Sequence, residues 1–103
     1  MINGSKKGKF YEWQLVQIFK KAGMEAQRAW NSDGKSLGKH HECDVLLEHE
    51  GKEYIIQAKR RKKISSFLTP SKHVDFHIMK GDREPDIVAM TIPTLLKLLK
   101  NEW

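Results

Sequence analysis

The stretch "ECDVLLEHEGKEYIIQAKRRKK", residues 42–63, contains two apolar runs on either side of a short polar segment. Residues 43–48 and residues 53–61 alternate in polarity with the two-residue period of a β-strand. The segment "HEGK" between them has the composition of a turn. The stretch therefore predicts a β-hairpin.

Helical and strand patterns flank this hairpin on both sides. Residues 9–22 have helical spacing, residues 24–30 are a short extended segment, and residues 31–41 are a loop. After the hairpin come a helical turn within residues 64–74, strands at residues 74–79 and 86–92, and a last helix opened by Pro93, with Leu95, Leu96, Leu98 and Leu99 on its buried face. The order predicts an α/β layered domain in which helices flank a mixed central sheet.

The composition favours one small basic domain. The chain has 103 residues and a net charge of +6, which predicts a single domain over residues 1–103, with residues 1–8 as a flexible lead-in. The charge favours a polyanionic partner, nucleic acid first, although basic residues can also be merely solubilising. There is no membrane-spanning run or secretory signal. The lone cysteine, Cys43, predicts a buried, reduced thiol in a cytoplasmic protein.

The polar residues of the hairpin collect at one end. Asp44 lies seven residues before Gly51 and Lys59 lies eight after it, so pairing brings Asp44 opposite Gln57 and Lys59. A carboxylate and a carbonyl oxygen are ligands that Mg²⁺ prefers, and a lysine beside them can orient a water or stabilise negative charge on a phosphate. The alternative is an ordinary cross-strand ion pair at a wet sheet end.

Glu12 is a second carboxylate, and it lies in an unusual place for an acid. Its position on the helical wheel falls within the apolar stripe of Leu15, Val16 and Phe19, where an acid is costly to bury. Either Glu12 marks the exposed first turn of the helix, or it points over the sheet end toward the metal at Asp44.

These residues resemble the PD-(D/E)xK nuclease superfamily and, within it, the archaeal-type Holliday junction resolvases. The similar elements are Gly8 and Glu12 on a first helix, a strand ending in Arg28, a Ser/Gly-rich loop at residues 31–38, the Asp44 strand, and the "QAK" triplet ending in Lys59. The resemblance covers residues 6–63 in order and spacing, and it implies a restriction-endonuclease-like core around the mixed sheet.

The resemblance implies a Mg²⁺-dependent DNA endonuclease, with Mn²⁺ able to substitute, that acts on branched DNA as a homodimer in recombination and repair. Glu12, Asp44, Gln57 and the carbonyl of Ala58 would hold the metal, and Lys59 would activate the attacking water. The residues expected to bind DNA are Lys6, Lys7, Lys9, Arg28, Ser32, Ser36, Lys39, His40, Arg60, Arg61, Lys62 and Lys63.

Two residues depart from the family pattern; the first keeps other functions open, and the second is a common exchange that weighs little. Gln57 stands where the family pattern has an acid, which removes one negative charge from the site, and Cys43 stands where the superfamily name has proline. The alternatives are a related nuclease acting on duplex or single-stranded DNA, and a DNA-binding module whose catalytic site has decayed. A zinc site at His40 and His41 would need further ligands.

Overall fold

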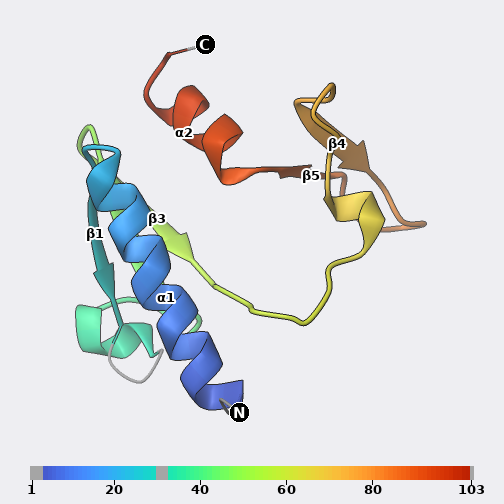
Figure 1. Cartoon of the computed structure of the whole chain (residues 1–103). Coiled ribbons are helices and arrows are strands. Elements are labelled where there is room, and N and C mark those ends of the chain that lie inside the picture. The colour runs from blue at the N-terminus through green and yellow to red at the C-terminus, as the bar shows by residue number, and fades with distance from the viewer. Residues whose placement is uncertain (1–3, 30–32, 103) are drawn as a thin grey trace. The chain divides into compact units, whose positions relative to one another are not determined.

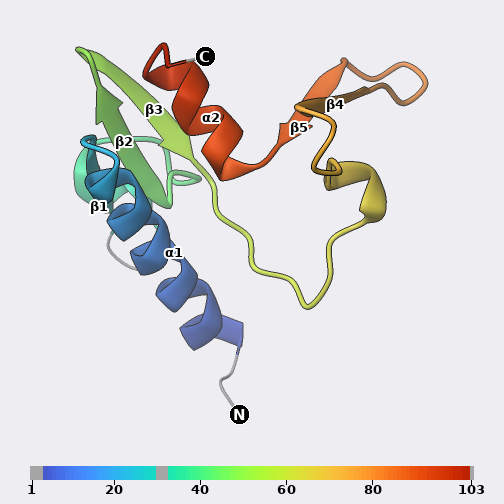
Figure 2. The same ribbon diagram turned by 45° about the horizontal axis from the view of Figure 1, so that its top comes forward.

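The computed structural model describes residues 4–29 and 33–102 and consists of two compact units, residues 1–60 and residues 61–103. The first unit contains helix α1 (Gly4–Lys21), strands β1 (Glu25–Arg28), β2 (Val45–His49) and β3 (Lys52–Ile56), and a short 3-10 helix, η2 (Gly34–Leu37). Figure 1 and Figure 2 show α1 lying along the sheet of this unit.

Helix α1 forms because its apolar residues recur at helical spacing and bury one stripe. Leu15, Val16 and Phe19 are buried on this stripe, as predicted. The helix begins at Gly4, before the start at Lys9 that the sequence pattern predicts. On its outer face, Trp13 is half exposed and stacks on Phe10, with ring centroids 5.8 Å apart.

The three strands of the first unit form an antiparallel sheet in the order β1-β2-β3. The predicted hairpin is confirmed: Val45 pairs with Ile56, and Gly51 takes a positive φ of 77° in the turn. Val45, Leu46 and Leu47 are all buried, so the central strand is covered on both faces.

The second strand of the hairpin is shorter than predicted. β3 ends at Ile56 rather than continuing to Arg61, because Asp44 replaces a main-chain partner at this point: its side chain accepts the hydrogen bond of the Ala58 amide. The "QAK" triplet therefore lies just beyond the strand.

The loop before β2 is packed closely against the chain that follows it. Gly34 is buried, and a Cβ atom there would lie 2.6 Å from Cβ of Cys43 and would overlap the carbonyl oxygen of His40. Asp33 caps η2 by accepting the Lys35 amide hydrogen at 3.0 Å. The region predicted as an irregular loop thus contains a short, capped helix.

The second unit contains η3 (Ser66–Leu68), β4 (Phe76–Met79), β5 (Ile87–Met90) and α2 (Ile92–Leu99). β4 and β5 pair as an antiparallel hairpin, and Pro93 lies in the first turn of α2, as predicted.

The predicted burial of the α2 leucines is wrong. Leu98 is 41% exposed, and Leu95, Leu96 and Leu99 are half-buried.

The α/β class is confirmed by two helices and five strands in the described part of the chain. Both sheets are antiparallel, and the apolar side chains that are fully buried lie in the first unit. Among the described residues, the longest helices are too short or too polar to cross a bilayer.

Candidate active site at the end of the β2–β3 hairpin

Asp44 is buried at the end of the hairpin and is held by three hydrogen bonds. Its main-chain amide donates to the Ile56 carbonyl at 2.8 Å, and its carbonyl accepts from the Ala29 amide at 2.9 Å. Its Oδ2 atom accepts from the Ala58 amide at 2.7 Å, a length typical of a bond to a charged acceptor. The main chain and side chain of Asp44 therefore join the ends of β1 and β3.

Glu12 is also buried, with only 4% of its surface exposed. Its Oε1 atom lies 3.7 Å from Nε of Arg28, the last residue of β1. The opposite charge of Arg28 offsets part of the cost of removing a carboxylate from water. Glu12 does not lie in the exposed first turn of α1, so that alternative is wrong.

The two buried carboxylates belong to the same end of the sheet. Arg28 pairs with Val45 in the β1–β2 register, and the next residue, Ala29, bonds to Asp44. Glu12 contacts Arg28 and therefore approaches this end from α1, whereas Asp44 approaches it from β2. Residues that are more than thirty positions apart in the chain are thus brought to one edge of the first unit.

The "QAK" triplet follows this edge directly. Gln57 and Lys59 are exposed and Ala58 is half-buried. The alternation of the hairpin carries over to Gln57, which stands opposite Asp44 because the register places Val45 opposite Ile56. The predicted proximity of Asp44 to the triplet is confirmed by the Ala58 hydrogen bond. The basic residues Arg60, Arg61, Lys62 and Lys63 continue from it and are all exposed.

Oxygen donors predominate at this edge. Asp44 keeps its Oδ1 atom and further lone pairs for a cation, and Glu12 presents a buried carboxylate. Carboxylate and carbonyl oxygens form the hard donor set that Mg²⁺ binds. The residues present at the sheet end therefore fit a magnesium ion, with Arg28 as the positive charge already beside Glu12.

Two of the loop residues predicted to bind DNA, Lys39 and Ser36, are hydrogen-bonded within the protein, and a third, His40, is exposed. Lys39 donates to Glu53 of β3 at 2.6 Å, and this hydrogen bond, together with the charge of Glu53, raises the pKa of Lys39 above its ordinary value. The hydroxyl of Ser36 donates to the Asp33 carbonyl at 3.1 Å. His40 is exposed in the turn before β2.

The remaining predicted DNA contacts lie on or next to α1. Lys9 is half-buried on the helix. Lys6 and Lys7 belong to the same helix, but their side chains, like the whole of Ser32, lie outside the described residues. Arg28 faces Glu12, so its ion pair competes with any phosphate contact.

The pairing of Lys39 with Glu53 was missed by the sequence analysis. The two residues are fourteen positions apart, and their contact depends on how the loop crosses the hairpin, which no local pattern encodes. Cys43 is buried as predicted, and this burial raises the pKa of its thiol.

Comparison with known proteins identifies the family. The family model described as archaeal Holliday junction resolvase (Hjc) matches residues 3–75, which include α1, the complete first sheet and the "QAK" triplet. Searches of the curated proteins and of the solved structures gave no match. Since the family model matches well over half of the chain, the chain belongs to the archaeal Holliday junction resolvase (Hjc) family.

Proposed function

We propose that this protein is a Mg²⁺-dependent endonuclease that cuts four-way DNA junctions, with Mn²⁺ able to replace Mg²⁺. The observation that carries the proposal is that two buried carboxylates, Glu12 and Asp44, both belong to the sheet end where the "QAK" triplet begins. Buried acids are costly to a small domain, so the presence of two of them at one place is best explained by a cation or reaction that uses them. Family membership supports the choice of a junction-resolving nuclease.

In the proposed site, Asp44 and Glu12 hold the metal ion, with Gln57 and the Ala58 carbonyl as further oxygen donors. The bound metal supplies positive charge at the phosphate that is cleaved and acidifies a water. The amide hydrogen bond from Ala58 orients the Asp44 carboxylate and leaves its other oxygen available.

Lys59 is proposed to act on the water that attacks the phosphate. It follows Ala58 by one residue, and its side chain is exposed, so it can reach a phosphate lying over the sheet end. Its ammonium group can orient the water and stabilise the negative charge that develops on the phosphoryl oxygens. Lys59 is exposed, whereas Asp44 is buried and hydrogen-bonded, so substitution of Lys59 should affect stability less than substitution of Asp44.

Phosphate binding is proposed for the basic surface around this edge. The exposed residues Arg60, Arg61, Lys62 and Lys63 directly follow Lys59 and would lie beside a DNA strand at the site. Neutralising several phosphates predicts binding that weakens steeply as salt increases. Lys39 would contribute only by exchanging its ion pair with Glu53 for a phosphate.

The proposal includes the fold core and the assembly. We propose a restriction-endonuclease-like core, a single functional domain over residues 1–103, and a homodimer, since two symmetric cuts in a junction need two sites. A protein with one reduced cysteine that processes DNA in recombination and repair is expected in the cytoplasm.

The test uses labelled four-way junction, duplex and single-stranded DNA, each with Mg²⁺, Mn²⁺ or EDTA. We expect cleavage of the junction with either metal and none with EDTA. Asp44→Asn and Lys59→Ala should abolish cleavage while retaining junction binding, and Lys72→Ala, an exposed lysine of the second unit, is the matched control. Equal cleavage of all three DNAs would refute junction specificity.

A second candidate function is a DNA-binding module without nuclease activity. It is favoured by Gln57, which provides an amide where the family pattern has an acid and so lowers the negative charge of the site. Binding of the junction without cleavage in any metal would support this function and refute the nuclease.

A further inference from the structure

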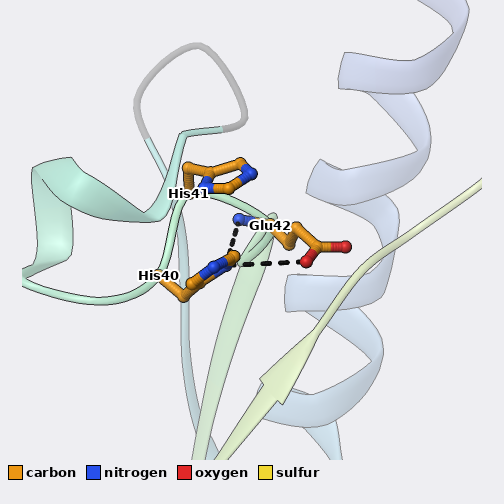
Figure 3. Close-up of side chains that lie close together, drawn as sticks. All are labelled: His40, His41 and Glu42. Carbon is orange, nitrogen blue, oxygen red and sulfur yellow. Dashed lines mark hydrogen bonds and ion pairs between the residues drawn. The ribbon is translucent and has the colours of Figure 1, made fainter.

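Three consecutive metal-ligating side chains lie close together in the turn before β2. His40, His41 and Glu42 each offer one ligand atom, and these atoms all lie within 4.8 Å of one another. All three residues are exposed. Figure 3 shows the carboxylate of Glu42 beside the His40 ring, with the His41 ring next to them. Among the described residues, no other group of three or more His, Cys, Asp or Glu side chains brings its ligand atoms this close together.

The main chain beneath these side chains is held in place. The carbonyl of His40 accepts from the Cys43 amide at 3.0 Å, and the preceding residue, Lys39, is bonded to Glu53 of β3. The close approach of Gly34 to His40 and Cys43 fixes the same turn from the other side. A cation would therefore meet a turn that is already formed, so only exposed side chains need to be ordered on binding.

The distances within the group suit a metal ion. Nδ1 of His40 lies 3.7 Å from Oε1 of Glu42, and two ligands at metal distances of about 2.0–2.2 Å in a tetrahedral site are separated by roughly 3.4 Å. The ring centroids of His40 and His41 are 4.1 Å apart. Because all three side chains are exposed, they can rotate to turn their ligand atoms toward one ion.

The hydrogen bond at His40 shows which ring nitrogen carries the lone pair. Nδ1 accepts the Glu42 amide hydrogen at 3.1 Å, so in the neutral ring Nε2 carries the proton. A metal bound at Nδ1 would displace the Glu42 amide from this nitrogen. The same metal would lie between Nδ1 and the Glu42 carboxylate, which now face each other directly.

We propose that His40, His41 and Glu42 form a binding site for a transition-metal dication of the Zn²⁺ type, separate from the proposed magnesium site. Two imidazoles and one carboxylate are a borderline donor set that Zn²⁺ and Co²⁺ prefer and Mg²⁺ does not. Three protein ligands leave at least one position for water. A zinc site at His40 and His41 needs further ligands, and Glu42 is one that the turn brings to His40.

The test is titration of the untagged, metal-free protein with Zn²⁺ by calorimetry, with Mg²⁺ in a parallel titration. We expect one Zn²⁺ per chain, little heat from Mg²⁺ at the same concentrations, and a rise in the thermal unfolding temperature with Zn²⁺. His40→Ala, His41→Ala and Glu42→Gln should each weaken Zn²⁺ binding by roughly ten-fold or more, as loss of a ligand does.

Two control variants make the result specific. His73→Ala removes an exposed histidine of the second unit and should leave Zn²⁺ binding unchanged. Asp44→Asn disrupts the proposed magnesium site and should leave in place the Zn²⁺ binding event that the His40, His41 and Glu42 variants weaken, so the two proposals are tested separately. Far-UV circular dichroism without metal checks that each variant is folded.

Several outcomes would overturn the proposal. Unchanged Zn²⁺ affinity in the variants of the turn would exclude these three ligands, and loss of binding in Asp44→Asn would assign the ion to the magnesium site. In the Co²⁺-substituted protein, a thiolate-to-metal charge-transfer band would show that Cys43 is a ligand and that the proposed ligand set is wrong.

Discussion

The hydrogen bond between Asp44 and the Ala58 amide allows the structural role of Asp44 to be separated from its proposed catalytic role. Two substitutions differ in what they leave behind. Asp44→Asn retains a side-chain oxygen that can accept from Ala58, whereas Asp44→Ala removes the acceptor. We therefore expect Asp44→Ala to destabilise the protein more than Asp44→Asn, while both lose DNA cleavage.

The size of the stability difference follows from the geometry. The bond is short, at 2.7 Å, and Asp44 is 8% exposed, but Ala58 is only half-buried. Leaving a buried donor unbonded costs about 1–3 kcal/mol, and water access at Ala58 places the expected loss for Asp44→Ala at about 1–2 kcal/mol. The neutral amide of Asn keeps about half of the bond, so Asp44→Asn should lose less than about 1 kcal/mol.

Urea unfolding followed by far-UV circular dichroism measures these losses. The midpoint should fall for Asp44→Ala with an unchanged slope, and less for Asp44→Asn. A matched control is Asp82→Ala, which removes an exposed carboxylate between β4 and β5 and should change the free energy of unfolding by less than about 0.5 kcal/mol.

Cleavage of a labelled four-way junction with Mg²⁺ completes the comparison. We expect both Asp44 variants to lose roughly a hundred-fold or more in rate, since a metal ligand supplies several kcal/mol of transition-state stabilisation. Equal destabilisation by the two substitutions would refute the role of the hydrogen bond. Full activity of Asp44→Asn would refute the role of Asp44 as a metal ligand.

Three further predictions test other parts of the first unit. Gly34→Ala should destabilise the protein by about 1–3 kcal/mol in urea unfolding, because its Cβ clashes with the turn before β2; Gly8→Ala, where the space for a Cβ is open, should instead stabilise α1 by up to about 1 kcal/mol. Glu53→Gln should lower the pKa of Lys39 toward its ordinary value of 10.5 in an NMR titration. Because the folded pKa is raised, the stabilisation from this ion pair is present at neutral pH and is lost only as the pH rises above that value, so an unchanged Lys39 titration in the variant would contradict the contact. Gln57→Glu should keep or raise junction cleavage at low Mg²⁺ by restoring one negative charge, and loss of activity would show that the amide has its own role.

Much of the first unit could be predicted from local patterns. The period of two in residues 43–48 and the glycine turn identified the hairpin, and the counting outward from Gly51 placed Asp44 opposite the "QAK" triplet. The helical stripe identified the buried face of α1 and the unusual position of Glu12 on it. These features could be predicted because strand alternation and helical spacing are properties of short segments.

Other features depend on contacts between distant segments. No pattern near Glu12 indicates that Arg28 is its partner, and nothing local pairs Lys39 with Glu53. The end of β3 at Ile56 was also missed, since it depends on a side chain of the opposite strand taking over a main-chain bond. The α2 leucines were predicted to be buried because their spacing is helical, but spacing does not show whether enough surface is available to cover them.

The sequence by itself determined the residue types at the candidate site and the local elements that carry them: Glu12 on a helix, and Asp44 and Lys59 at one end of a hairpin. The tertiary structure decided that the two carboxylates belong to one sheet end, through Arg28 and the pairing of β1 with β2. It also decided that Glu42 joins His40 and His41. The physical reason is that periodicity is set by the geometry of each segment, whereas proximity depends on long-range packing and on the close turn at Gly34.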